Sequence, residues 1–122
     1  MTIPSGFHLR LARPGEGGLL REVMLACWTG TVAENSSAYR ETAEGIEAQL
    51  AGGGAVIVFE GERPVGAGRF YPVPGPAGDA RMWVEIKRIG VLKMHRKLGL
   101  GAPLVAALED EARARGHAGR DR

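Results

Sequence analysis

The sequence has little of what a disulfide-bonded, secreted or membrane protein needs. Its 122 residues include one cysteine, Cys27, so no disulfide can form within the chain. No apolar run approaches the roughly 20 residues that a membrane-spanning helix requires. The N-terminus has neither the basic start nor the apolar stretch of a secretory signal. We therefore expect a cytoplasmic protein without a membrane segment.

Residue patterns that bind metals or nucleic acids are also missing. His8, His95 and His117 are far apart and have no metal-ligand spacing with Cys27 or with a cluster of carboxylates, so we predict no metal site. Aromatic residues make up only 6% of the chain, and none alternates with basic residues as in a base-stacking surface. This argues against nucleic acid as a partner.

The composition is that of a globular domain. Hydrophobic residues make up 44% of the chain and charged residues 25%, which is close to the usual balance. A chain of 122 residues is long enough to bury a core as one unit. Because no internal repeat is present, we expect residues 1–122 to form a single domain.

The net charge of +2 is unevenly distributed. Residues 1–80 carry six basic and nine acidic side chains, whereas residues 81–122 carry ten basic and five acidic ones. A stretch with several basic residues and no acidic one predicts an anion site, although a solvated basic face is the alternative. The basic residues of this stretch are Lys87, Arg88, Lys93, Arg96 and Lys97.

Hydrophobic periodicity, together with glycine and proline breaks, predicts the element order β-α-α-β-β-β-α. This is a mixed α/β layout rather than a series of βαβ units. The predicted elements are a strand over 7–13, helices over 16–28 and 39–50, a hairpin over 55–71, a loop over 72–78, a strand over 81–91 and a helix over 101–115.

The most informative segment is 89–102, where a strand leads through a basic, glycine-rich loop to a helix start. Backbone N–H groups at a helix start have no acceptor within the helix, and the helix dipole adds partial positive charge there. Gly99 and Gly101 have no Cβ to hold a phosphate away from the main chain, and Arg96 and Lys97 add formal charge. The segment therefore predicts a pyrophosphate site.

Two common phosphate loops are excluded by this sequence. The pattern G-x-x-x-x-G-K-[ST] does not occur, and Leu104 stands where a Rossmann fingerprint has its third glycine. What remains is R-x-x-G-x-G, from Arg96 to Gly101, after the predicted fourth strand. Here the sequence resembles the GCN5-related N-acetyltransferase (GNAT) family. The resemblance covers essentially the whole chain and implies an α/β fold with helices flanking a mixed, mostly antiparallel sheet.

The resemblance implies that acetyl-CoA is the acetyl donor and that a primary amine, on a small molecule or a peptide, is the acceptor. The alternative function is a weak or inactive GNAT remnant that binds CoA or a protein partner. By the resemblance, the pantetheine arm pairs with Ile89, Gly90 and Val91. The pyrophosphate is held by the main-chain amides of Arg96, Lys97, Leu98, Gly99, Leu100, Gly101 and Ala102.

Glu85 is the candidate general base that deprotonates the acceptor ammonium, directly or through water. It lies among apolar residues of the predicted strand over 81–91, and desolvation makes a carboxylate more basic. The structural alternative is that Glu85 forms an ion pair with Lys87 or Arg69.

The sequence departs from the family pattern in two places. Many relatives have proline where Lys93 stands and glycine where Lys97 stands, and Lys97 fits only if its φ is negative. The chain also stops at Arg122, where the family's fifth strand begins, so we expect a fold without the usual last strands and without the usual acid for the thiolate. Tyr71 could replace that acid only if the fold brings it to the cleft. Because an uncovered strand edge invites pairing with another chain, we expect a homodimer through this edge.

Several further residues also have expected roles. Cys27 lies on the apolar stripe of the first predicted helix, which predicts a buried structural thiol. Trp28 is expected to pack in the core. His95 is expected to be a loop residue near the phosphate. Glu34 or Glu41 could meet the acceptor ammonium, but a solvated surface acid is the expected role of each.

Overall fold

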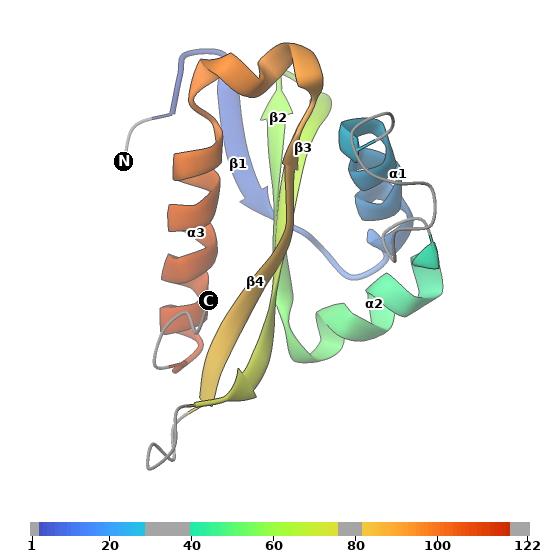
Figure 1. The fold of residues 1–122 in the computed structure, drawn as a ribbon, viewed down its shortest axis with the longest axis vertical. Coiled ribbons are helices and arrows are strands. Elements are labelled where there is room, and N and C mark those ends of the chain that lie inside the picture. Colours follow the sequence, from blue (N-terminus) through green and yellow to red (C-terminus); the bar gives the residue numbers. More distant parts are fainter. Residues whose placement is uncertain (1–2, 29–39, 76–81, 118–122) are drawn as a thin grey trace.

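The computed structural model describes residues 3–28, 40–75 and 82–117 (Figure 1). Its elements follow the predicted order, with a short 3-10 helix added before the last α-helix. The elements are β1 (Phe7–Leu11), α1 (Gly17–Trp28), α2 (Ala43–Gly52), β2 (Gly54–Glu60), β3 (Arg63–Pro74), β4 (Met82–Val91), η2 (Lys93–Leu98) and α3 (Gly101–Ala114).

The four strands form one sheet in the order β1-β2-β3-β4, and each neighbouring pair is antiparallel. Figure 1 shows α3 on one face of the sheet and α1 and α2 on the other. This arrangement confirms the predicted α/β class, an antiparallel sheet flanked by helices. In the part of the chain that the structure describes, β1 and β4 are the edge strands.

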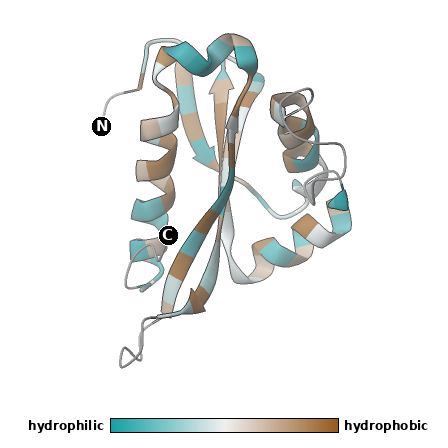
Figure 2. Cartoon of the chain, in the orientation of Figure 1, coloured by the Kyte–Doolittle hydropathy of each residue, from teal (hydrophilic) through white to brown (hydrophobic). Residues whose placement is uncertain are grey.

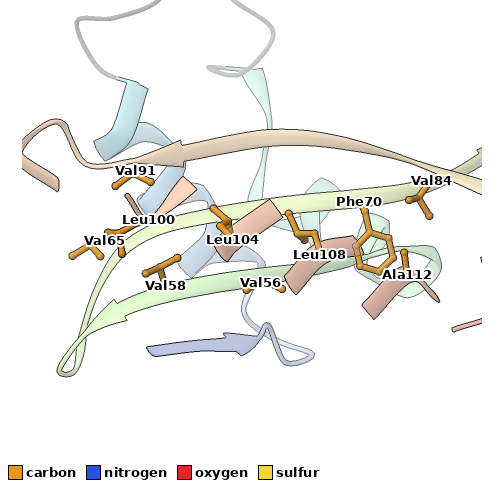
Figure 3. Packing of buried hydrophobic residues seen from close by; sticks show 10 residues of the cluster. All are labelled: Val56, Val58, Val65, Phe70, Val84, Val91, Leu100, Leu104, Leu108 and Ala112. Atoms are coloured by element: carbon orange, nitrogen blue, oxygen red, sulfur yellow. The ribbon is translucent and has the colours of Figure 1, made fainter. Parts of the chain in front are cut away.

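Each face of the sheet has its own hydrophobic core because side chains alternate along β2. Val56 and Val58 belong to the core against α3, whereas Ala55 and Ile57 belong to the core against α1 and α2. Hydrophobic residues recur along α1, α3 and the strands (Figure 2). Figure 3 shows the core on the α3 side, which comprises Val56, Val58, Val65, Phe70, Val84, Val91, Leu100, Leu104, Leu108 and Ala112.

Helices α1 and α2 pack closely at the start of α1. A Cβ on Gly17 would lie 2.5 Å from the carbonyl oxygen of Ala43, so glycine permits this approach. The carboxylate of Glu47 on α2 accepts hydrogen bonds from the amides of Gly15 at 2.6 Å and Gly17 at 2.9 Å, which satisfies N–H groups at the helix start. The predicted apolar stripe of α1 is confirmed by its buried residues Leu20, Val23, Met24 and Cys27.

The predicted start of the second helix was wrong. The helix α2 begins at Ala43 rather than at 39, because Thr42 caps it. The hydroxyl of Thr42 accepts a hydrogen bond from the amide of Gly45 at 3.0 Å, and threonine in an extended conformation favours this cap position. Tyr39 and Glu34 lie outside the residues that the structure describes.

The predicted end of the hairpin was also wrong. Strand β3 continues to Pro74, although its prolines predicted a loop from Pro72 onwards. The ladder between β2 and β3 ends where Gly54 lies opposite Phe70, so the last residues of β3 pair only with β4. Proline has no N–H to donate, and a strand with one open side tolerates it.

Glu16 links β1 to the start of α1 and makes the fold sensitive to acid. Its carboxylate oxygens accept hydrogen bonds from Nη1 and Nη2 of Arg10, both at 2.8 Å, and from the amide of Arg13 at 2.7 Å. The hydrogen bonds from Arg10 lower the pKa of Glu16 from 4.5 to about 2. A carboxyl whose pKa is lower in the folded state stabilises the fold above its unfolded pKa and loses that contribution as the pH falls.

We expect the free energy of unfolding to fall by about 1 kcal/mol through this group between pH 4.5 and pH 2, because solvent screens a partly exposed ion pair. Glu16→Gln should remove this part of the pH dependence, while Glu62→Gln in the exposed turn between β2 and β3 should retain it. Denaturant unfolding at a series of pH values measures the difference. Parallel curves for wild type and Glu16→Gln would contradict the assignment.

Candidate functional site

The loop between β4 and α3 leaves an open helix start. After η2, Gly99 adopts a φ of 74°, and α3 begins at Gly101 without a side-chain cap. The amides of Gly101 and Ala102 lie in the first turn, where N–H groups have no acceptor within the helix. A Cβ on Gly99 or Gly101 would meet no atom within 4 Å beyond the neighbouring residues. Space, N–H donors and the helix dipole therefore coincide here, and these residues fit a pyrophosphate.

The charged side chains of the loop have different orientations. Lys93 and Lys97 are exposed, and φ of Lys97 is negative, because in the described ranges only Arg88 among non-glycine residues has a positive φ. Arg96 is also an exposed residue, but its guanidinium is hydrogen-bonded to the main chain of the protein. Its Nη2 donates to the carbonyl oxygen of Cys27 at 2.7 Å and its Nε to that of Val91 at 3.2 Å. Its side chain ties the loop to the end of α1, and its main chain stays in the loop.

Strand β4 contains a bulge at Arg88. The register with β3 shifts between Ala67 and Arg69, and Arg88 adopts a φ of 58°. Residues with a Cβ rarely occupy this left-handed region. A bulge leaves its extra residue outside the regular ladder and increases the local twist.

The bulge also reverses the alternation of side chains along β4. Ile86 packs against the core on the α3 side, so in a regular strand the odd-numbered residues after it would face the other way. Instead Ile89 and Val91 pack against the same core. Gly90 faces α1, where an added Cβ would lie 2.5 Å from Nε1 of Trp28. Glycine therefore lets the end of α1 lie directly on this strand segment.

Glu85 lies on β4 opposite Tyr71 of β3, on the face covered by α1 and α2. Its side chain is 19% exposed, and its Oε1 is 2.9 Å from Nζ of Lys87, one of the two expected ion-pair partners. The hydroxyl of Tyr71 donates to Oε1 of Gln49 on α2 at 2.7 Å, and burial raises the pKa of Tyr71. The sheet thus brings a carboxylate and a phenol to neighbouring positions.

A charged cluster under α1 and α2 involves Glu41, and the expectation that Glu41 is a solvated surface acid was wrong. Its side chain is 15% exposed. Its Oε1 accepts hydrogen bonds from Nη2 of Arg69 at 2.6 Å and Nε of Arg88 at 2.9 Å, and its Oε2 accepts one from Nη1 of Arg69 at 3.2 Å. Burial alone would raise the pKa of Glu41, but the two guanidinium groups lower it below its ordinary value. The carboxylate is therefore a weak base.

One signal in the sequence pointed to this cluster. Arg69 stands between the apolar residues Ala67 and Phe70 in the sequence. In the structure it is 2% exposed, and a charge buried to this extent requires a partner of opposite charge. The sequence did not reveal which acid would supply it, because Glu41 is 28 residues away along the chain.

The remaining candidate residues are buried or partly buried. His95 is 8% exposed, and its Nε2 is 3.1 Å from Oε1 of Glu60 on β2. Cys27 is buried, as predicted, and burial raises the pKa of its thiol to about 11. Trp28 packs against the core on the α1 side, as expected. In the described part of the chain, no three His, Cys, Asp or Glu residues gather as for a metal ion. No helix there is long and apolar enough to cross a membrane.

The fold and the loop together define a class of protein. An antiparallel sheet whose last strand leads through a loop into a covering helix is the arrangement that solved acetyltransferases share with this chain. Residues 19–120 match the sequence model of the acetyltransferase (GNAT) family. The chain belongs to this family, and the predicted family is confirmed. Acetyl-CoA is the acetyl donor of GNAT enzymes, in agreement with the donor that the sequence predicts.

A curated relative matches about half of the chain. The uncharacterised N-acetyltransferase YjcF of Bacillus subtilis is 39% identical over 64 residues, which make up 52% of this chain and 41% of that protein. The chain therefore spans less than half the length of this relative.

Solved structures of the family share the fold. A GCN5-related N-acetyltransferase from Ralstonia eutropha superposes with a TM-score of 0.75 at 18% identity, covering 94% of this chain and 81% of that one. A GNAT acetyltransferase from Brucella melitensis in complex with acetyl-CoA has a TM-score of 0.71 at 22% identity, covering 91% of this chain and 71% of that one. At these identities the likeness shows the fold.

Proposed function

We propose that residues 1–122 form an acetyl-CoA-binding domain that transfers the acetyl group to a primary amine. The observation that carries this proposal is the start of α3, which has no side-chain cap. Cβ atoms added at Gly99, before the helix, or at Gly101, its first residue, would meet open space. When bound, acetyl-CoA supplies an acetyl group activated as a thioester. The pyrophosphate would lie on the main-chain amides from Arg96 to Ala102.

The edge of β4 is the proposed seat of the pantetheine arm. Because β4 is an edge strand in the described sheet, one side of its main chain has no partner strand there. Ile89 and Val91 turn their side chains into the core on the α3 side, and Gly90 carries no side chain. Main-chain N–H and C=O groups of this segment can therefore bond an extended amide chain as an added strand would.

Glu85 is the proposed base. Its carboxylate would accept a proton from the acceptor ammonium, directly or through one water molecule. The side chain of Glu85 is 19% exposed and that of its ion-pair partner Lys87 is 50% exposed, so the carboxylate is not fully enclosed. Tyr71, opposite Glu85 in the register, is the proposed proton donor to the leaving group.

Calorimetric titration of CoA and acetyl-CoA into the wild-type chain tests the proposal first. We expect saturable binding of both ligands. An acetyl-transfer assay with a panel of polyamines, amino acids and peptide N-termini then tests catalysis. Binding without transfer to any amine would favour the alternative, a CoA-binding module without activity, and no binding would contradict the proposal as a whole.

A homodimer through the edge of β4 belongs to the same proposal, and a cytoplasmic location remains a prediction. Met82, at the start of β4, is 46% exposed, and an open strand edge favours pairing with a second chain. The proposed pantetheine segment is 89–91, so the second copy would pair with residues 82–86. Light scattering at micromolar concentration should give the mass of a dimer, with and without CoA. A monomer mass in both states would contradict the dimer.

A further inference from the structure

The bulge at Arg88 places a residue with a Cβ in the left-handed region, which is disfavoured for such residues. The side chain of Arg88 supplies a restraint that holds it there. Its Nε donates to Oε1 of Glu41 at 2.9 Å, and its guanidinium lies over the ring of Trp28, 5.6 Å from the ring centroid. The conformation of one strand residue is therefore linked to a carboxylate outside the sheet.

Glu41 is itself held by two other elements. Arg69 of β3 donates to both carboxylate oxygens, and the pair is largely buried. Nε of Arg21 on α1 donates to the main-chain carbonyl of Glu41 at 2.9 Å. Because side chain and main chain are both bonded, Glu41 is a fixed anchor for Arg88.

The strand segment directly after the bulge is the one proposed to receive pantetheine. Loss of the bulge would shift the register by one residue and would exchange the faces to which Ile89, Gly90 and Val91 turn. We propose that Glu41 is a positioning residue: through Arg88 it holds the β4 bulge and so presents segment 89–91 to the pantetheine arm. This inference rests on the proposed function, and it concerns the pantetheine part of the donor site only.

Binding of two ligands can test the pyrophosphate part and the pantetheine part of the donor site separately. ADP carries a pyrophosphate without pantetheine, whereas CoA carries both. We expect Glu41→Gln to weaken CoA binding about tenfold, because hydrogen bonds to a charged group are lost. ADP binding should change by less than about twofold, because the start of α3 does not depend on Glu41. Glu44→Gln, at an exposed acid in the first turn of α2, is the matched control and should change neither affinity.

Glu41→Gln leaves the buried charge of Arg69 without a carboxylate, which can prevent folding. Two variants of Arg88 test the inference in that case. Arg88→Gly and Arg88→Ala retain the Arg69–Glu41 pair and remove the link from Glu41 to β4 together with the contact between Arg88 and Trp28. Glycine adopts a positive φ without strain. We therefore expect Arg88→Gly to retain more CoA affinity than Arg88→Ala, with ADP affinity unchanged in both.

The outcomes distinguish the inference from the function on which it rests. The inference would be contradicted if Glu41→Gln lost affinity for CoA and ADP equally, or if Arg88→Ala kept its affinity for CoA. Either outcome would leave the proposed function standing. A wild-type chain that binds neither ligand would overturn the proposed function, and the inference with it. A selective loss of CoA affinity supports both.

Discussion

Replacing Gly101 with aspartate is expected to weaken CoA binding about 100-fold, because a carboxylate would stand where the pyrophosphate should lie. The chain should remain folded. A Cβ at this position meets no atom within 4 Å beyond the neighbouring residues, and an acidic residue in the first turn of a helix interacts favourably with the helix dipole. Calorimetric titration of CoA into both proteins measures the two dissociation constants.

Gly52→Asp is the matched control for this substitution. Gly52 ends α2, and a Cβ there also meets open space, so the same change in size and charge is made away from the donor loop. We expect this variant to bind CoA as the wild type does. Wild-type affinity in a folded Gly101→Asp protein would show that CoA does not bind at the start of α3.

The features predicted correctly from the sequence are those that local patterns determine. The strand β2, predicted as the first strand of the hairpin over 55–71, and the stripe of α1 each need only one element to be recognised, because both show in a local run or period of apolar residues. The position of the loop from Arg96 to Gly101 could also be predicted from the sequence, since a helix start, two glycines and a basic stretch are contiguous in the chain. Added Cβ atoms at Gly99 and Gly101 would meet open space, and the anion site there stays a prediction.

The features missed are those that depend on partners distant in the sequence. Prolines can lie at the end of β3 because β2 no longer pairs with β3 there. The residues 72–74 themselves contain no signal for where β2 ends. The direction of the Arg96 side chain depends on the carbonyl of Cys27, 69 residues earlier. The charge of Arg96 was predicted to face the phosphate because the local pattern contains only neighbours along the chain.

The bulge in β4 was not predicted, although the sequence contains a signal for it. Apolar residues recur at Val84 and Ile86 and then at Ile89 and Val91, so the period of two breaks once between them. A break of this kind in a strand indicates an extra residue. The sequence could not show why the bulge centres on Arg88, since that depends on Glu41 and on the packing of α1 against Gly90.

Glu85→Gln is expected to lower kcat for acetyl transfer about 100-fold, the usual size of the contribution of a general base. Glutamine has nearly the same shape but cannot accept the ammonium proton, so binding of acetyl-CoA should be unchanged. Steady-state kinetics with a primary amine found in the panel, at saturating acetyl-CoA, measure kcat. Glu62→Gln, an exposed acid in the turn between β2 and β3, serves as the control and should retain full activity.

The position of Glu85 on β4 explains why we expect its substitution to lower kcat but to leave the affinity for acetyl-CoA unchanged. It lies four residues before Ile89, on the face covered by α1 and α2, and its carboxylate is paired with Lys87 rather than with the donor loop. A structural role for the ion pair would instead lower the unfolding midpoint and donor affinity together. Full kcat in a folded Glu85→Gln variant would remove Glu85 as the base and leave proton transfer to a water molecule or to another group on this face.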